Sequence, residues 1–344
     1  MVCIAAVCIP AAYIYDLLPF GTDDSDGPLV IKAEDFGIFL FESSEEIYRA
    51  NVKDPDLWAE LRENALVDRE YEQHYLWLYD AYNSWDAKRR NQLKTIMTTY
   101  EPHDLVQSMV AEGKHNADFD EILRFMRDNW AYREQNSLLI DFYKWYGENY
   151  ARPHYQQIKP SLQRKVDVTM GMVEQDFDII KFMENETGVK REKKYDQMEL
   201  QLSMRIIGMS VYSQKRDTIT TVQWNRSPEK IWTAVFNEFS TGFLNSFTDS
   251  LSFRNMTRKL KRDNTLMVRY NENIPYSWEG WIDKNLAEGF AHYLVSRKGI
   301  SKDLKESTYV FDREYAQALY NGFDPAKGSL KNFTTEFLKK NYKI

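Results

Sequence analysis

The sequence predicts a mostly helical α+β fold with one small, mainly antiparallel sheet in the second half of the chain. Two observations favour this fold class. Apolar and aromatic residues recur three and four positions apart from about residue 44 to 185, and again from 227 to the end. Between these blocks, 194–213 and 217–224 contain near-alternating stretches, the second rich in Thr and Val, which is typical of strands. The 344 residues are therefore expected to form helices, a sheet and then more helices.

Residues 1–27 form a hydrophobic leader or anchor followed by an acidic linker. The apolar run "VCIAAVCIPAAYIY" has 14 residues, whereas a membrane-spanning helix needs about 20, and no Lys or Arg precedes Lys32. Its length suits a signal-peptide core or the remainder of an anchor, and a frayed hydrophobic terminus is the alternative. The first two interpretations predict a protein that is extracytoplasmic or tethered to a membrane.

Residues 28–188 are expected to form a mainly helical N-terminal region. The stretch "LVIKAEDFGIFLF" (29–41) is rich in Ile, Val and Phe and is predicted to be extended. The last helix of this region is predicted to be long and to end at Gly188. After it, the short connection "QKR" predicts an antiparallel pairing between 194–213 and 217–224.

The stretch "SPEKIWTAVFNEFSTGFLNSF" (227–247) predicts an amphipathic helix. Ser227 is a suitable N-cap, and Pro228 fits the first turn. At about 100° per residue, aromatic and aliphatic side chains cover one face, while Asn237, Glu238 and Thr241 gather on the other.

A second helix is predicted over 277–299, ending at Gly299. Glu288 and His292 stand one turn apart on it and share a side with Asn285. Taken alone, this Glu and His are an ordinary exposed pair.

The spacing in the first helix is that of a zinc site without its histidines. Two His at positions i and i+4 hold one Zn²⁺, the intervening Glu acts as general base, and a later helix supplies a third ligand. Here Glu238 stands at the general-base position. Asn237 and Thr241 stand where the two His are needed, and neutral oxygen donors bind Zn²⁺ much more weakly than imidazole.

The segment "VFNEFSTGFLNS" resembles the active-site helix of gluzincin-type HExxH metallopeptidases. It is similar to a group of poorly characterised bacterial peptidase-like proteins in which the segment reads approximately HEFSHxFVNP. Downstream, "WIDKNLAEGFAHYL" resembles the helix that supplies the glutamate ligand, with Glu288 in that place. The resemblance implies that 189–344 is a metallopeptidase-like region with a zincin-like active-site helix and a glutamate helix.

The resemblance also implies roles for individual residues. Glu238 is a vestigial general base, and Glu288 is the only family-type metal ligand retained. Asn237, Thr241, Glu288 and His292 are expected to line the old cleft. With both histidine ligands lost, we expect a non-catalytic protein without a metal cofactor, a pseudoenzyme.

Three functional hypotheses follow. In the first, the cleft binds a peptide or protein partner, with 217–224 as an edge strand that accepts an added strand. In the second, the chain is an active metal-dependent hydrolase whose rebuilt zinc site uses Glu288, Glu238 and His292. In the third, it is a helical structural protein in which Glu238 and Glu288 lie far apart.

Composition excludes several other classes. Both cysteines, Cys3 and Cys8, lie in the first eight residues, so the rest of the chain has no disulfide, thiolate metal site or cysteine nucleophile. The formal charge of −7 gives no electrostatic reason to expect nucleic acid as a partner. The basic stretch 254–264 is expected to be a solvated helix face. No GxSxG elbow or glycine-rich phosphate loop occurs in the sequence.

Overall fold

The computed structural model describes residues 29–54, 58, 62–63, 66, 69–100, 102–129, 136–173, 177–190, 197–205, 210–214, 217–224, 227–272, 277–301 and 309–342. The leader predicted over 1–27 lies outside these residues. Across the described residues the chain is mostly helical with one small sheet, which confirms the predicted α+β class.

The sheet contains four strands in the order β1-β2-β4-β3. They are β1 (Leu29–Ala33), β2 (Met198–Ser203), β3 (Ser210–Gln214) and β4 (Asp217–Gln223). The hairpin of β3 and β4 is antiparallel as expected, but β1 pairs with β2, and β2 with β4, in parallel. The prediction of a mainly antiparallel sheet is therefore wrong, because long crossovers place β1 and β2 beside strands to which no short turn joins them.

The position of β4 corrects a second expectation. Strand 217–224 was expected at an edge, yet β4 has β2 on one side and β3 on the other. The edge beside β4 is β3, and it is partly covered. The Gln107 side chain donates to Ser213 O (2.8 Å) and accepts from Ser213 N (2.9 Å), the pattern that an added strand would make.

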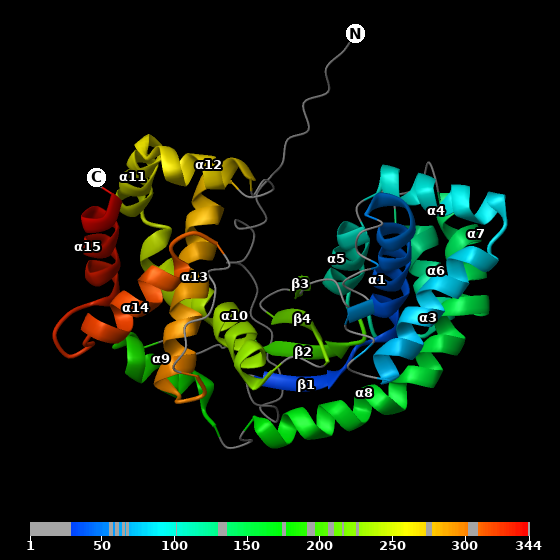
Figure 1. Cartoon of the computed structure of the whole chain (residues 1–344), viewed down its shortest axis with the longest axis horizontal. Coiled ribbons are helices and arrows are strands. Elements are labelled where there is room, and N and C mark those ends of the chain that lie inside the picture. Colours follow the sequence, from blue (N-terminus) through cyan, green and yellow to red (C-terminus); the bar gives the residue numbers. More distant parts are fainter. Residues whose placement is uncertain are drawn as a thin grey trace, which may run out of the picture.

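Helices flank the sheet on both sides (Figure 1). The N-terminal group comprises α1 (Phe36–Tyr48), the π-helix η2 (Arg49–Lys53), α3 (Arg69–Ser84), α4 (Ala87–Thr99), α5 (Pro102–Ala111), α6 (Phe119–Asp128), α7 (Asn136–Tyr146) and the π-helix η4 (Gly147–Ala151). The long helix α8 (Arg152–Met172) runs beneath the sheet in this view. The C-terminal group comprises α9 (Ile179–Thr187), α10 (Pro228–Thr248), α11 (Leu251–Lys259), the 3₁₀-helix η5 (Leu260–Arg262), α12 (Asn264–Glu272), α13 (Trp278–Arg297), α14 (Asp312–Gly322) and α15 (Leu330–Tyr342).

Two element boundaries differ from the predictions. The stretch 29–41 is not extended throughout, because β1 ends at Ala33 and α1 begins at Phe36. The long helix expected before Gly188 is two helices, since the Asp178 side chain accepts from Lys181 N and starts α9 anew. Gly188 ends α9 at a φ of 68°, as predicted.

The two faces of the sheet differ in chemistry. Along β2, Met198, Leu200 and Leu202 are buried on one face, while Gln201 and Ser203 are buried on the other. A hydrophobic core on one side and a buried polar layer on the other therefore meet at this strand.

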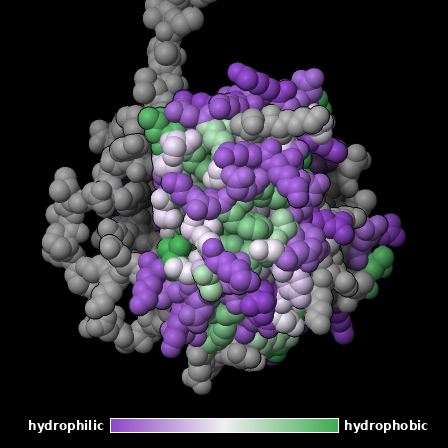
Figure 2. Space-filling model, turned by 90° about the vertical axis from the view of Figure 1, so that its left-hand side faces the viewer, coloured by the Kyte–Doolittle hydropathy of each residue, from purple (hydrophilic) through white to green (hydrophobic). Residues whose placement is uncertain are grey.

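The outer face of the C-terminal helices is mostly hydrophilic, with apolar side chains between the polar ones (Figure 2). Among the described helices, none has both the length and the apolar character that crossing a bilayer requires.

Candidate functional site

Helix α10 carries the first half of the site and is held by its aromatic face. The Ser227 side chain accepts from Lys230 N at 3.4 Å and caps the helix, with Pro228 as its first residue. Trp232 and Phe236 are buried and stack with ring centroids 5.2 Å apart. Trp232 also packs against Phe177 with ring centroids 5.3 Å apart, and Phe236 packs against Phe182 at 5.7 Å. These contacts with residues at and before α9 fix the rotation of α10, so that Asn237 and Glu238 face another element.

That element is α13, which packs between α10 and α14. Gly289 permits the close approach of α14, because a Cβ atom there would lie 2.5 Å from the backbone oxygen of Asp312. Asn285 is fully buried, and its Oδ1 accepts from Val310 N (2.9 Å) and Phe311 N (3.0 Å). Asn285 therefore holds the segment before α14 and does not face a ligand.

Asn237, Glu288 and His292 come together although 51 residues separate the first two. The Asn237 amide donates a short hydrogen bond to Glu288 Oε2. On the other side of the same carboxylate, His292 Nε2 lies 3.5 Å from Glu288 Oε1, which is an ion-pair distance. Glu288 thus has one partner on α10 and one on α13. The side chains of Glu288 and His292 remain 13% and 14% exposed, respectively.

Glu238 lies beside this group, close enough for the charge of Glu288 to act on it. Among the described residues, its buried Oε1 has no hydrogen-bond partner. Burial raises the pKa of Glu238, the charge of Glu288 raises it further, and Lys284 partly offsets both. Glu238 is partly buried, and an acid with a raised pKa in such a position is typical of functional sites.

His292 is biased toward its charged form. Burial of the ring opposes protonation, but the adjoining Glu288 carboxylate outweighs it and raises the pKa of His292, aided by the charges of Asp312 and Glu229. The Glu288–His292 contact is therefore an ion pair over a wider pH range than an isolated histidine would allow.

Thr241 does not join the group, since its side chain is exposed one turn further along α10. Glu238, Glu288 and His292 are donors of types that zinc accepts, but among the described residues their ligand atoms are not gathered around one point. Zn²⁺ needs three or four nitrogen, sulfur or carboxylate ligands around one point. Here the Asn237 amide N–H points instead at the Glu288 carboxylate, between α10 and α13.

The fold also joins residues that looked scattered in the sequence. His74 Nδ1 lies 2.9 Å from His154 Nε2, and His74 Nε2 lies 3.2 Å from Glu46 Oε2, all three residues being buried. A second group contains Asp35, His115 and Glu199. No spacing rule finds either group, because each combines three segments that only the tertiary fold brings together.

Compared with protein-family models, curated proteins and solved structures, the chain gives no significant match. Function is therefore inferred from the site itself.

Proposed function

We propose that this chain is a metallopeptidase-like protein that no longer hydrolyses peptides and that binds a peptide or protein partner at the surface made by Asn237, Glu238, Glu288 and His292. The observation that carries the proposal is the hydrogen bond from Asn237 to Glu288. In a zinc peptidase a metal ion lies between the ligands of the two helices and lowers the pKa of its bound water to about 7. With an amide in that place, no group activates water in this way.

Glu238 supports partner binding. A buried carboxyl oxygen without a hydrogen-bond partner costs free energy, which a bound donor would recover. The strongest donors for a carboxylate are cationic N–H groups. The partner we propose therefore presents a peptide N-terminus or a Lys or Arg side chain to Glu238.

A second candidate function is hydrolysis at a rebuilt metal site. The raised pKa of Glu238 favours it, because a general acid or base works best with a pKa near the operating pH. Fluorogenic peptide libraries separate the two functions. Hydrolysis that disappears in both Glu238→Gln and Glu288→Gln supports the hydrolase, and equal background rates in the three proteins support the binding function.

The proposed ancestry is tested by restoring the missing ligands. The Asn237→His/Thr241→His variant is expected to bind one equivalent of Zn²⁺ more than the wild-type chain, and Glu288→Gln in that background is expected to remove it. The matched control is Thr241→His/Asn245→His, which carries the same pair one turn further along α10. If both double variants bind zinc equally well, Glu288 is not a ligand and the kinship proposal fails.

Partner binding is tested directly with displayed peptide libraries panned against the full chain. We expect binders whose affinity falls in Glu238→Gln and on acetylation of the peptide N-terminus or replacement of its basic residues. Binders that are indifferent to Glu238→Gln contradict the proposed site.

We also propose that the leader at 1–27 directs the chain out of the cytoplasm or tethers it to a membrane, so that the partner is met there. Cell fractionation with N-terminal sequencing of the mature chain tests this. Recovery of the intact chain in the cytosolic fraction contradicts it.

A further inference from the structure

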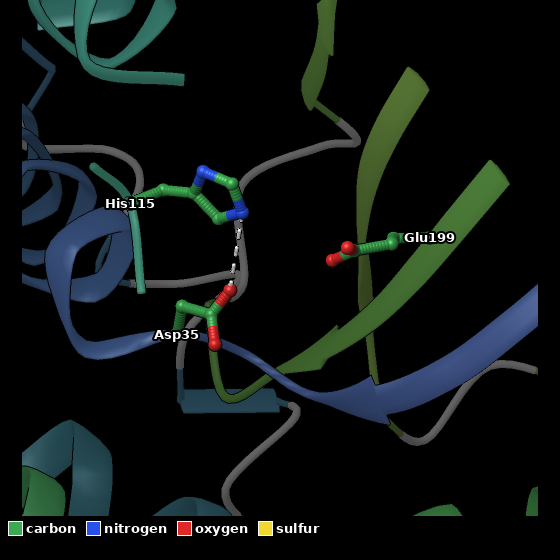
Figure 3. A group of neighbouring side chains, drawn as sticks. All are labelled: Asp35, His115 and Glu199. Carbon is green, nitrogen blue, oxygen red and sulfur yellow. Dashed lines mark ion pairs between the residues drawn. The ribbon is translucent and has the colours of Figure 1, made fainter. Parts of the chain in front are cut away.

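Three side chains with metal-binding chemistry converge at the end of β1 that leads into α1. Asp35 lies between β1 and α1, His115 lies in the connection from α5 to α6, and Glu199 lies on β2. One ligand atom of each lies within 4.8 Å of the others. Figure 3 shows the His115 ring and the Asp35 carboxylate facing each other, with Glu199 extending from its strand toward them.

His115 lacks the hydrogen bonds that a buried imidazole normally makes. It is only 4% exposed, and its buried Nδ1 has no partner among the described residues. Its Nε2 points at Asp35 Oδ2 from 3.8 Å, which is beyond hydrogen-bonding distance.

Lys32 occupies the space between the two carboxylates. Its Nζ lies 2.9 Å from Asp35 Oδ2 and 2.7 Å from Glu199 Oε2. The Gln201 amide donates to the same two oxygens at 2.8 and 3.1 Å, so the carboxylates are held in place without Lys32. The Lys32 side chain is 30% exposed and has a long flexible stem, so its ammonium can leave by rotating into solvent.

The charges favour this exchange. The carboxylates of Asp35 and Glu199 and the ammonium of Lys32 together carry one net negative charge. A divalent cation in place of the ammonium neutralises both carboxylates and gives the His115 ring a partner at Nε2. One nitrogen and two carboxylate ligands suit Zn²⁺ or Mn²⁺, whereas Mg²⁺ and Ca²⁺ prefer sites made of oxygen alone.

We propose that Asp35, His115 and Glu199 form a site for a divalent transition-metal ion, and that Lys32 competes with the ion for this place. The bound ion ties the start of α1 to the connection between α5 and α6, so its role is to stabilise the N-terminal region. This site shares no residue with the surface of α10 and α13.

Zinc titration of the full chain by calorimetry tests the site, with Cys3→Ser and Cys8→Ser introduced to remove thiolates that bind zinc. We expect one equivalent of Zn²⁺ and a rise in melting temperature on binding. Glu199→Gln and His115→Asn are expected to weaken binding by about 100-fold. Lys32→Met is expected to strengthen it by about tenfold, since the competitor is gone. Lys114→Met is the control, because this nearby lysine pairs with Glu121 outside the cluster and leaves the affinity unchanged.

If Lys32→Met instead lowers the melting temperature and the variant binds no zinc, the cluster is an ion-pair network with a structural role only, and the proposal is overturned. Zinc affinity that Glu199→Gln does not change also overturns it, because the ion then lies elsewhere. If His115→Asn fails to fold, Glu199→Gln still tests the site, because the Glu199 side chain is partly exposed and its substitution is easier for the fold to accept. A negative result leaves the proposal for α10 and α13 untouched, since none of these variants alters that surface.

Discussion

Acids lie beside the sheet on both sides, and on the α1 side Glu42 and Glu34 are held by an ion pair and by hydrogen bonds. Glu42 is 2% exposed, and it pairs with Arg205 at 2.5 Å and accepts from the Tyr212 hydroxyl. Glu34 is 1% exposed and accepts from Ser203 at 2.8 Å. Burial and the charge of Glu42 raise the pKa of Glu34, whereas Arg205 and the Tyr212 hydrogen bond together outweigh burial and lower the pKa of Glu42. Of the two carboxyls, Glu34 is therefore the one that binds a proton more readily.

On the α10 side, Glu238 is only partly buried, and different charges act on it. All three acids have one buried carboxyl oxygen without a hydrogen-bond partner among the described residues, but Glu42 has an arginine ion pair, whereas Glu238 is acted on by Lys284 and by a second acid, Glu288. The comparison separates two uses of a buried carboxyl. A charge whose partners are all internal specifies the architecture, whereas a charge left open at a helix pair is available to a ligand. Substitutions on the α1 side should therefore cost stability, and those at Glu238 should cost binding.

The largest effect is expected for Arg205→Met. Removing the cation leaves Glu42 charged and buried, so the free energy of unfolding should fall by about 3–5 kcal/mol in denaturant titrations. The control is Arg258→Met. Arg258 pairs with Glu279 at 3.2 Å but is 57% exposed, so its loss should cost about 0–1 kcal/mol. Equal losses in the two variants would mean that the buried network does not stabilise the fold.

A smaller loss is expected for Gly289→Ala, which moves α13 without changing a charge. The added Cβ would lie 2.5 Å from the Asp312 backbone oxygen, and the backbone cannot yield as a side chain does. We expect a loss of about 1–3 kcal/mol and weaker partner binding, because Glu288 is the neighbouring residue. Gly171→Ala in α8 is the control. Nothing lies within 4 Å of its Cβ position, so the substitution should stabilise by about 0.5–1 kcal/mol.

Glu238→Gln is expected to stabilise the protein while it weakens binding. The folded-state pKa of Glu238 is raised, so the wild-type chain loses stability as the pH rises through that value. The variant should match the wild type at pH 4 and exceed it at pH 8 by about 0.5–2 kcal/mol.

Glu279→Gln should show the reverse sign. Arg258 and a backbone N–H outweigh partial burial and lower the pKa of Glu279, so this group stabilises the fold above its ordinary pKa. Its variant should be the less stable protein at pH 8. A Glu238→Gln variant that is also less stable at pH 8 would show that Glu238 has a stabilising partner.

Local signals predicted the helices that carry the site. Ser227 and Pro228 open α10 as expected, and Gly299, at a φ of 79°, follows α13. These caps act within one turn, so the sequence contains all the information about them. The expectation that Glu238 and Glu288 lie near each other rested on the resemblance to zincins alone, because no local sequence rule relates two helices so far apart in the chain.

The sheet and the clusters could not be predicted in the same way. The parallel pairing of β1 with β2 depends on a crossover of more than 160 residues, which strand patterning does not encode. The same holds for His74 with His154 and for His115 with Glu199. Each of these histidines has polar or aromatic neighbours in sequence that are typical of an exposed helix or loop, and only the fold buries them.

The smallest effect concerns the charge state of His292, whose partner Glu288 is the residue of α13 that binds Asn237 of α10. The folded-state pKa of His292 is raised above its ordinary value of about 6.5. The Glu288–His292 pair therefore contributes its full stabilisation below the ordinary pKa, and this contribution is lost as the pH rises through the raised pKa. Wild type should exceed His292→Gln by about 1 kcal/mol or less near pH 6, and the difference should vanish at higher pH. An NMR titration of the His292 ring measures the pKa directly, and Glu288→Gln should lower it. A His292 pKa that Glu288→Gln does not move would mean that the pair seen across one turn of α13 is not an ion pair in solution.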